Sequence, residues 1–166
     1  MLRRIVFAIL LLAFPSLAFA GPKEDAQAAF DKFFPAFTAA RVDDVVGLFA
    51  SDALFYGTSS REVVTTPAGV RAYFTNAFGT PPRAPGIDTA SQLGTATVLM
   101  LSDNAAVISG MWKIDSIAGG QTATRGPFRV TAAVSKRGER WQIVQFHNSP
   151  QPAAPAPAAP VAPPVR

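Results

Sequence analysis

The second half of the sequence consists of four strand-length segments separated by turn signals. The segments are residues 89–101, 105–114, 121–136 and 141–149. The stretches between them are rich in Gly, Asp and Asn, with Asn104, the pair Gly119-Gly120 and Gly138 at their centres. Consecutive strands joined by such short turns pair in an antiparallel arrangement. This half of the chain therefore predicts an antiparallel meander.

Helical patterns come before the strands. From Glu24 to Ala40, Phe30, Phe34 and Phe37 recur at i, i+4 and i+7 and form one apolar stripe, which predicts a core-facing helix. Pro35 lies inside this run and is expected to kink or split the helix.

Three more elements are predicted between Asp43 and Phe78. Asp43 is a candidate N-cap for a short helix. A strand is expected over Ala53–Tyr56, with a resumption over Arg61–Val64. Thr66 followed by Pro67 is a strong helix start, and that helix is expected to run to about Phe78. Helices followed by a bent antiparallel sheet predict an α+β fold with two packed layers.

The ends of the chain differ in composition from its centre. A positive pair, Arg3-Arg4, precedes an apolar run and the small-residue site Ala18-Phe19-Ala20, which predicts a signal peptide over residues 1–20. An uncleaved N-terminal anchor is the alternative. After cleavage we expect a periplasmic or secreted protein without stable membrane insertion. Residues 150–166 include seven prolines and are mostly Pro and Ala, which predicts a disordered tail.

Residues 21–149 are expected to form one domain. They contain 12 Lys and Arg against 11 Asp and Glu, so the formal net charge of +4 for the whole chain comes largely from its ends. No basic cluster interleaves with aromatic residues, and nucleic acid is not an expected partner. The chain has no cysteine, so its stability must come from a core rather than from disulfides.

The last predicted strand contains the only histidine of the chain. If side chains alternate along it, Trp141, Ile143, Gln145, His147 and Ser149 share one face. That face begins apolar and ends in an imidazole and a hydroxyl, which predicts the polar floor of a pocket.

Several short motifs recur in an order that resembles a known superfamily. They are Leu54-Phe55-Tyr56-Gly57-Thr58, Thr66-Pro67, Tyr73-Phe74, Gly110, Arg129-Val130-Thr131, Lys136-Arg137, Trp141-Gln142-Ile143-Val144 and His147-x-Ser149. Together they resemble the nuclear transport factor 2-like superfamily, in the branch of the calcium/calmodulin-dependent kinase II association domain and the iota-class carbonic anhydrases. The resemblance implies a cone-shaped α+β fold, with N-terminal helices packed on a curved, mostly antiparallel sheet.

The resemblance to the iota-class carbonic anhydrases also implies a site. It implies that Thr58, Tyr73 and Ser149 bind bicarbonate, with His147 beside them. The group's signature is His-His-Ser-Ser-x-Met-Pro, whereas this chain has Phe-His-Asn-Ser-Pro-Gln-Pro over residues 146–152. The changed positions Phe146 and Asn148 are expected on the opposite face of the strand.

The residues allow a chemical reading of this site. Thr58, Tyr73 and Ser149 can donate hydrogen bonds to substrate oxygens, and the imidazole of His147 can relay a proton. Arg129 either counters an anionic ligand or faces solvent. One histidine and no cysteine cannot build a usual zinc site, so the chain would have to work without a metal or with carboxylate ligands. No cofactor is expected. The plainer alternatives are a structural histidine, a strand-end or turn hydroxyl, and a packed tyrosine.

Two classes of function remain open. One is an enzyme, a carbonic anhydrase-like lyase that hydrates carbon dioxide. The other is a non-catalytic module that binds a small molecule or only oligomerises. In both cases a homodimer through the exposed face of the sheet is expected, and the fold alone does not decide between them.

Overall fold

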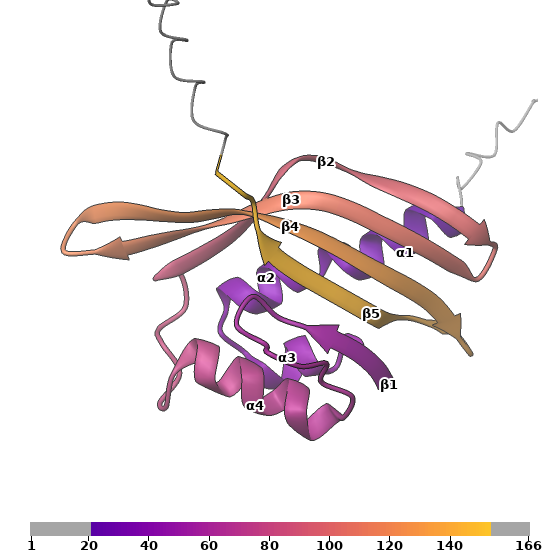
Figure 1. Ribbon diagram of the computed structural model, residues 1–166, viewed down its shortest axis with the longest axis horizontal. Helices are drawn as coiled ribbons and strands as arrows, with labels where there is room; N and C mark the ends of the chain where they lie inside the picture. Colours follow the sequence, from indigo (N-terminus) through magenta and orange to yellow (C-terminus); the bar gives the residue numbers. More distant parts are fainter. Residues whose placement is uncertain (1–20, 154–166) are drawn as a thin grey trace, which may run out of the picture.

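The computed structural model describes residues 21–153 (Figure 1). The expected signal peptide and residues 154–166 of the expected tail lie outside this range. Within it, no helix is both long enough and apolar enough to cross a membrane.

The predicted N-terminal helix is split in two. Helix α1 spans Pro22–Asp31 and α2 spans Phe33–Thr38. Pro35, in the first turn of α2, has no N–H to donate to the carbonyl of Asp31, so the chain cannot continue as one regular helix. The split brings Phe33, Phe34 and Phe37 together as buried residues of α2.

Helices α3 and α4 follow. Helix α3 spans Val42–Val46, and its N-cap is Arg41 rather than the predicted Asp43. Asp43 lies in the first turn instead, where a negative charge faces the positive end of the helix dipole. Helix α4 spans Pro67–Phe78, and the Thr66 hydroxyl accepts a hydrogen bond from the Gly69 N–H at 3.1 Å, as Thr66-Pro67 predicts.

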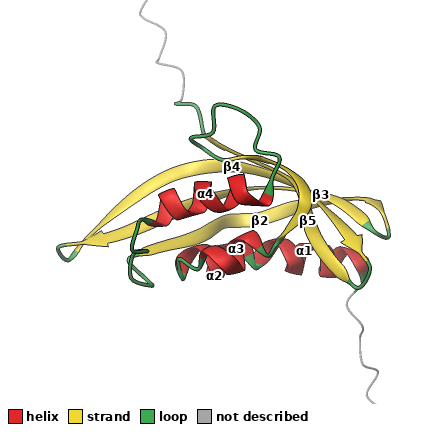
Figure 2. Ribbon diagram, turned by 90° about the horizontal axis from the view of Figure 1, so that it is seen from below, coloured by secondary structure: helices red, strands yellow, loops and turns green. Residues whose placement is uncertain are grey.

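Five strands form one sheet in the order β1-β5-β4-β3-β2. Their bounds are β1 Phe49–Tyr56, β2 Asp88–Ser102, β3 Ala105–Ala118, β4 Gln121–Arg137 and β5 Arg140–Pro150. Strands β2 to β5 pair antiparallel in sequence order, which confirms the meander, and β1 joins β5 in parallel. The expected strand resumption over Arg61–Val64 is only one bridge, between Val64 and Phe55. The sheet curves around the helices (Figure 2).

The folded part extends slightly beyond its predicted end at Ser149. Pro150 is the last residue of β5 and pairs with Phe128, and the Gln151 N–H donates to the Pro127 carbonyl at 2.9 Å. The first residues of the expected tail therefore belong to the sheet.

The core lies between the helices and the concave face of the sheet. Phe33 is at its centre and is 2 % exposed. Its ring lies between 5.2 and 6.1 Å from five other aromatic rings, those of Phe34, Phe37, Phe74, Trp112 and Phe146. Aromatic side chains therefore set the spacing between the two layers.

Candidate functional site

A cavity of about 300 Å³ opens between the helices and the sheet. Eight of its lining residues are aromatic: Phe33, Phe37, Phe55, Tyr73, Phe74, Trp112, Phe128 and Phe146. Its polar lining residues, besides Tyr73, are Thr58, Ser59, Arg125 and Asn148. The cavity is thus an aromatic chamber with a few polar groups.

Two of the residues predicted for the site, Thr58 and Tyr73, line this cavity. Thr58 follows the end of β1, and Tyr73 is on α4. Gly57 brings them together because the Tyr73 ring lies directly on its backbone, where a Cβ atom would overlap the ring. The glycine next to Thr58 is therefore required by the position of the tyrosine.

Replacing Gly57 with alanine should force the Tyr73 ring out of its position. We expect a loss of about 1–3 kcal/mol in the free energy of unfolding, because the added methyl group cannot fit without movement. Denaturant unfolding measures this loss. In a Tyr73→Ala background the cost of Gly57→Ala should largely disappear. An equal cost in both backgrounds would contradict this account.

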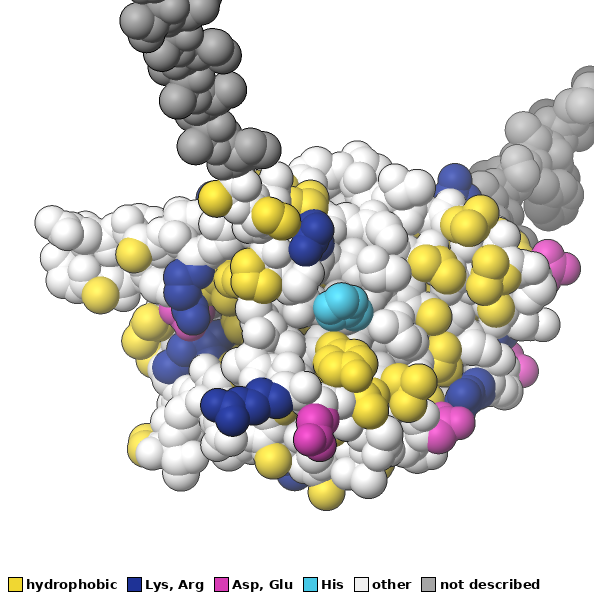
Figure 3. Space-filling view, in the orientation of Figure 1, with side chains coloured by type: hydrophobic (Ala, Val, Ile, Leu, Met, Phe, Trp, Pro, Cys, Tyr) yellow, Lys and Arg dark blue, Asp and Glu magenta, His cyan; other side chains and the backbone are white. Residues whose placement is uncertain are grey.

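His147, Ser149 and Arg129 do not line the cavity. Figure 3 shows the single histidine at the surface, and its ring packs 5.9 Å from that of Tyr56. Arg129 is exposed and is the register partner of Ser149 on the neighbouring strand, so these two side chains also share the outer face of the sheet. The expectation that His147 and Ser149 face the pocket is wrong, and of the two alternatives for Arg129 the structure has the solvent-facing one. Any catalytic or binding role for the three residues stays a prediction.

A β-bulge is the physical reason for this difference. Gln145 pairs with Ala133 and Ile143 pairs with Val134, so Val144 is an extra residue in β5. One extra residue moves every later side chain to the other face of the sheet. Ile143 is buried as predicted, but beyond the bulge the buried residues are Phe146 and Asn148.

Asn148 is the central polar residue of the cavity, although regular alternation along β5 predicts it on the opposite face. Its Oδ1 accepts a hydrogen bond from the Trp112 indole N–H at 2.8 Å, and its Nδ2 donates to Thr58 Oγ1 at 2.7 Å. An indole nitrogen can only donate, so the amide must present its oxygen to Trp112 and its NH₂ group to Thr58. The Thr58 hydroxyl is then an acceptor in this chain and has its own proton free to donate elsewhere. No sequence signal marked this role, because Gln145, His147 and Ser149 are also polar residues of β5.

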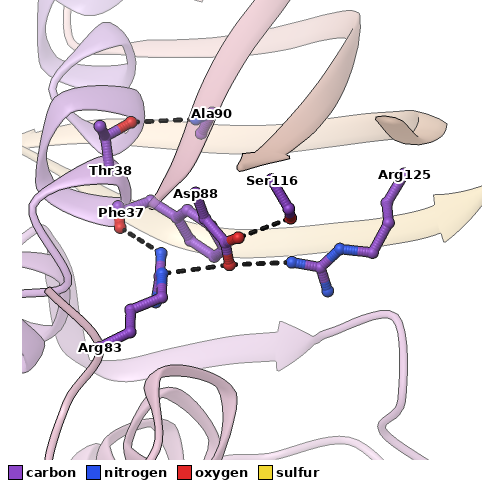
Figure 4. A network of polar contacts seen from close by, with 7 residues as sticks. All are labelled: Phe37, Thr38, Arg83, Asp88, Ala90, Ser116 and Arg125. Carbon is purple, nitrogen blue, oxygen red and sulfur yellow. Dashed lines mark hydrogen bonds and ion pairs between the residues drawn. The ribbon is translucent and has the colours of Figure 1, made fainter. Parts of the chain in front are cut away.

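A network of charged residues lies beside the cavity (Figure 4). Asp88, at the start of β2, accepts hydrogen bonds from Ser116 Oγ at 2.5 Å and from Arg125 Nη2 at 2.9 Å. Its Oδ2 is also 3.1 Å from Arg83 Nε, an ion-pair contact without good hydrogen-bond alignment. One buried carboxylate thus holds two guanidinium groups.

Arg83 is the structural member of this network. Its guanidinium lies over the rings of Phe37 and Phe78, at 5.1 and 4.6 Å, and its Nη2 donates to the Phe37 carbonyl at 2.9 Å. Burial lowers the pKa of Arg83, and the nearby Asp88 carboxylate partly offsets that effect. Arg125 is more exposed and reaches the cavity.

The titratable residues in the lining are Tyr73 and Arg125; no carboxylate, imidazole or thiol from residues 21–153 lines the cavity. A general base with a pKa near neutrality is thus missing from the lining within this range. The groups that are present can orient a bound molecule by hydrogen bonding and by charge.

Comparisons with known proteins agree with this architecture. A calcium/calmodulin-dependent protein kinase II association domain from Xanthomonas campestris, so assigned provisionally, is similar, with 23% identity and a TM-score of 0.65 over 79% of this chain and 89% of that one. An NTF2-like protein with a cystatin-like fold from Novosphingobium aromaticivorans has 13% identity and a TM-score of 0.64, covering 80% and 84%. A protein from the same species, provisionally assigned as an aromatic ring hydroxylase, has 18% identity and a TM-score of 0.63, covering 78% and 91%. No curated protein sequence matches significantly.

These similarities establish the nuclear transport factor 2-like fold, an α+β cone of helices on a curved, unclosed sheet. The SnoaL-like domain family matches residues 26–154, which include every helix and strand except the first turn of α1. The chain belongs to the SnoaL-like domain family.

Proposed function

We propose that this protein is a binding module that takes up a small aromatic molecule in the cavity. The observation that carries the proposal is the lining, in which eight aromatic side chains surround a space of about 300 Å³. That volume is at the lower end of the range for ligand sites, and such sites combine apolar walls with a few placed polar groups. A single ring with one polar substituent matches this size and chemistry.

Hydrogen bonding supplies the orientation of the ligand in this proposal. The free proton of Thr58 and the remaining N–H of Asn148 lie on the same polar side of the cavity. Both groups donate. Asn148 is buried, and its hydrogen bond with Trp112 fixes the amide before a ligand arrives. A preorganised donor pair favours binding because little side-chain entropy remains to be lost.

The two indole groups of the chain give a direct test. Trp112 lines the cavity and Trp141 does not, so a ¹H–¹⁵N spectrum contains one indole signal that reports on the cavity and one that serves as an internal control. Titration with benzyl alcohol should shift the Trp112 signal in a saturable manner and leave the Trp141 signal in place. A Trp141→Phe variant assigns the two signals.

A pair of variants on α4 makes this test specific. Ala77 lines the cavity at an exposed position, whereas Ala72 is exposed on the same helix outside the lining. Ala77→Phe should abolish the saturable shift, and Ala72→Phe should preserve it. The absence of any saturable shift in the wild-type protein, or an equal shift in both variants, would refute the proposed binding site.

Hydration of carbon dioxide is the second candidate function. It is favoured by one observation, which is that Thr58 and Tyr73 both line the cavity. Stopped-flow measurement of hydration by residues 21–166 should then show acceleration that Thr58→Val removes. Because His147 is on the outer face, His147→Ala should have no effect on a reaction inside the cavity. No acceleration would eliminate this candidate and leave the binding module.

We also propose that the protein is exported by cleavage after Ala20 and forms a homodimer through the outer face of the sheet. Leu99 and Leu101 of β2 are 61 % and 62 % exposed, and Leu54 of β1 is also exposed. Exposed apolar side chains on a sheet mark candidate interaction surfaces. Mass spectrometry of the protein from a bacterial periplasm tests the cleavage.

Sedimentation measures the dimer. The double variant Leu99→Asp/Leu101→Asp should shift a dimer to monomer, because two charges on the proposed contact surface would have to be desolvated. Ser102→Asp is the control, because it adds one charge at an exposed position of the same strand without removing a leucine. A wild-type monomer, or a dimer unaffected by the double variant, would contradict the proposal.

A further inference from the structure

The charged network beside the cavity contains more positive than negative charge. Asp88 contacts both Arg83 and Arg125, so the three residues together have a net charge of +1. Asp88 is only 8 % exposed, and no other acidic side chain of residues 21–153 pairs with either arginine. An anion at this place would complete the charge balance.

Arg125 is the arginine that a ligand can reach. Its side chain is 56 % exposed and lines the cavity, whereas Arg83 is enclosed between two phenylalanine rings. Asp88 holds Arg125 through one nitrogen, Nη2. A guanidinium has five N–H donors, so the others remain available, and its planar fork matches a carboxylate.

The other polar groups of the cavity also favour an anionic ligand. Thr58 has a proton free to donate, and the Asn148 amide presents its NH₂ group on the side away from Trp112. An ionised carboxylate accepts hydrogen bonds and cannot donate them, so it is complementary to a group of donors and a cation. A cationic ligand would instead meet the positive charge of Arg125.

We propose that the ligand of this cavity is an aromatic carboxylate and that Arg125, positioned by Asp88, is its ion-pair partner. The inference rests on the proposed binding function and specifies the ligand class. The aromatic ring would lie among the phenylalanine side chains, with the carboxylate at the polar edge of the cavity.

Benzoate and benzamide provide a matched pair of probes, because they have nearly the same shape and differ in charge. Binding of each is measured by the shift of the Trp112 indole signal at neutral pH. In the wild-type protein, benzoate should bind about tenfold more tightly than benzamide, as expected for one charge-assisted contact at a partly exposed site. Added salt should weaken benzoate binding more than benzamide binding.

Arg125→Gln should reduce this preference to about one while benzamide still binds. The glutamine amide can still donate to Asp88, and the position of the Trp112 signal reports whether the fold is intact. Arg125→Lys keeps the charge and should retain part of the preference. Arg71→Gln is the control, because Arg71 is an exposed arginine of α4 that pairs with Asp43 outside the cavity.

The outcomes separate the two proposals. If benzamide binds as tightly as benzoate, or the preference survives in Arg125→Gln, the inference about the carboxylate is overturned and the binding module stands. If neither compound shifts the Trp112 signal, and benzyl alcohol also fails, the binding module itself is refuted. If the preference for benzoate is lost in Arg125→Gln but kept in Arg71→Gln, the result supports both the binding module and the carboxylate ligand.

Discussion

Replacing Asp88 with leucine should lower the free energy of unfolding by about 3–5 kcal/mol, because a buried guanidinium loses its partner. Arg83 is enclosed by Phe37 and Phe78, and burial already lowers its pKa. Without the carboxylate, the charge of Arg83 remains in a poorly solvated place. Ser116 also loses the acceptor of its 2.5 Å hydrogen bond. Denaturant unfolding followed by circular dichroism measures the change.

A second substitution should reverse much of this loss. In Arg83→Met/Asp88→Leu the buried charges are gone, and apolar replacements of a buried ion pair are often neutral or stabilising. The double variant should therefore be more stable than Asp88→Leu alone. Asp115→Leu is the control, since Asp115 is a surface carboxylate paired with Lys113, and it should cause a much smaller loss. A double variant less stable than Asp88→Leu would show that Arg83 does not depend on Asp88.

Replacing Phe33 with alanine should lower the free energy of unfolding by about 3–5 kcal/mol, the range for removal of a buried aromatic ring. Phe33 contacts five other aromatic rings and connects α2 to α4, β3 and β5. Its removal deletes these contacts and enlarges the cavity that it lines.

Two control variants test whether the loss comes from the buried position and the volume of the Phe33 side chain. Phe33→Leu keeps most of the volume and should cost less than Phe33→Ala. Val63→Ala removes an exposed apolar side chain outside the sheet and should change stability by no more than about 0.5 kcal/mol. A loss below about 1 kcal/mol for Phe33→Ala would mean that the aromatic cluster is not the centre of the core.

Much of the fold could be predicted because its signals are local. Asn104, Gly119-Gly120 and Gly138 fall at the three hairpin turns, and each predicted strand of the meander agrees with the structure to within a few residues. Thr66 and Pro67 start α4 through a cap that needs only residues three positions apart. The parallel pairing of β1 with β5 has no local signal, because it joins residues about 90 positions apart.

The faces of β5 could not be predicted because one residue inverts them. Alternation was correct at Ile143, but the bulge at Val144 places Phe146 and Asn148 in the cavity and His147 and Ser149 outside it. No glycine or proline marks the bulge, so the sequence gives no warning of it.

The polar contacts of the site could not be predicted from the sequence either, because they depend on tertiary structure. Trp112 and Asn148 are 36 residues apart, and Asp88 meets Arg125 across 37 residues. Thr58 and Tyr73 were predicted from the family resemblance, which implies that they lie close together but gives no physical reason for it. Arg125 and Asn148 lie outside the residues that the resemblance implies, and only their place in the fold identifies them.

Crystallography with a heavy-atom ligand tests the central claim most directly. Crystals of residues 21–166 soaked in 4-bromobenzyl alcohol should show one strong anomalous bromine peak inside the cavity, among Phe33, Phe55 and Trp112. The hydroxyl should lie near Thr58 and Asn148. Bromine found only at the molecular surface, with the aromatic side chains closed over an empty centre, would contradict the account of a ligand-binding cavity.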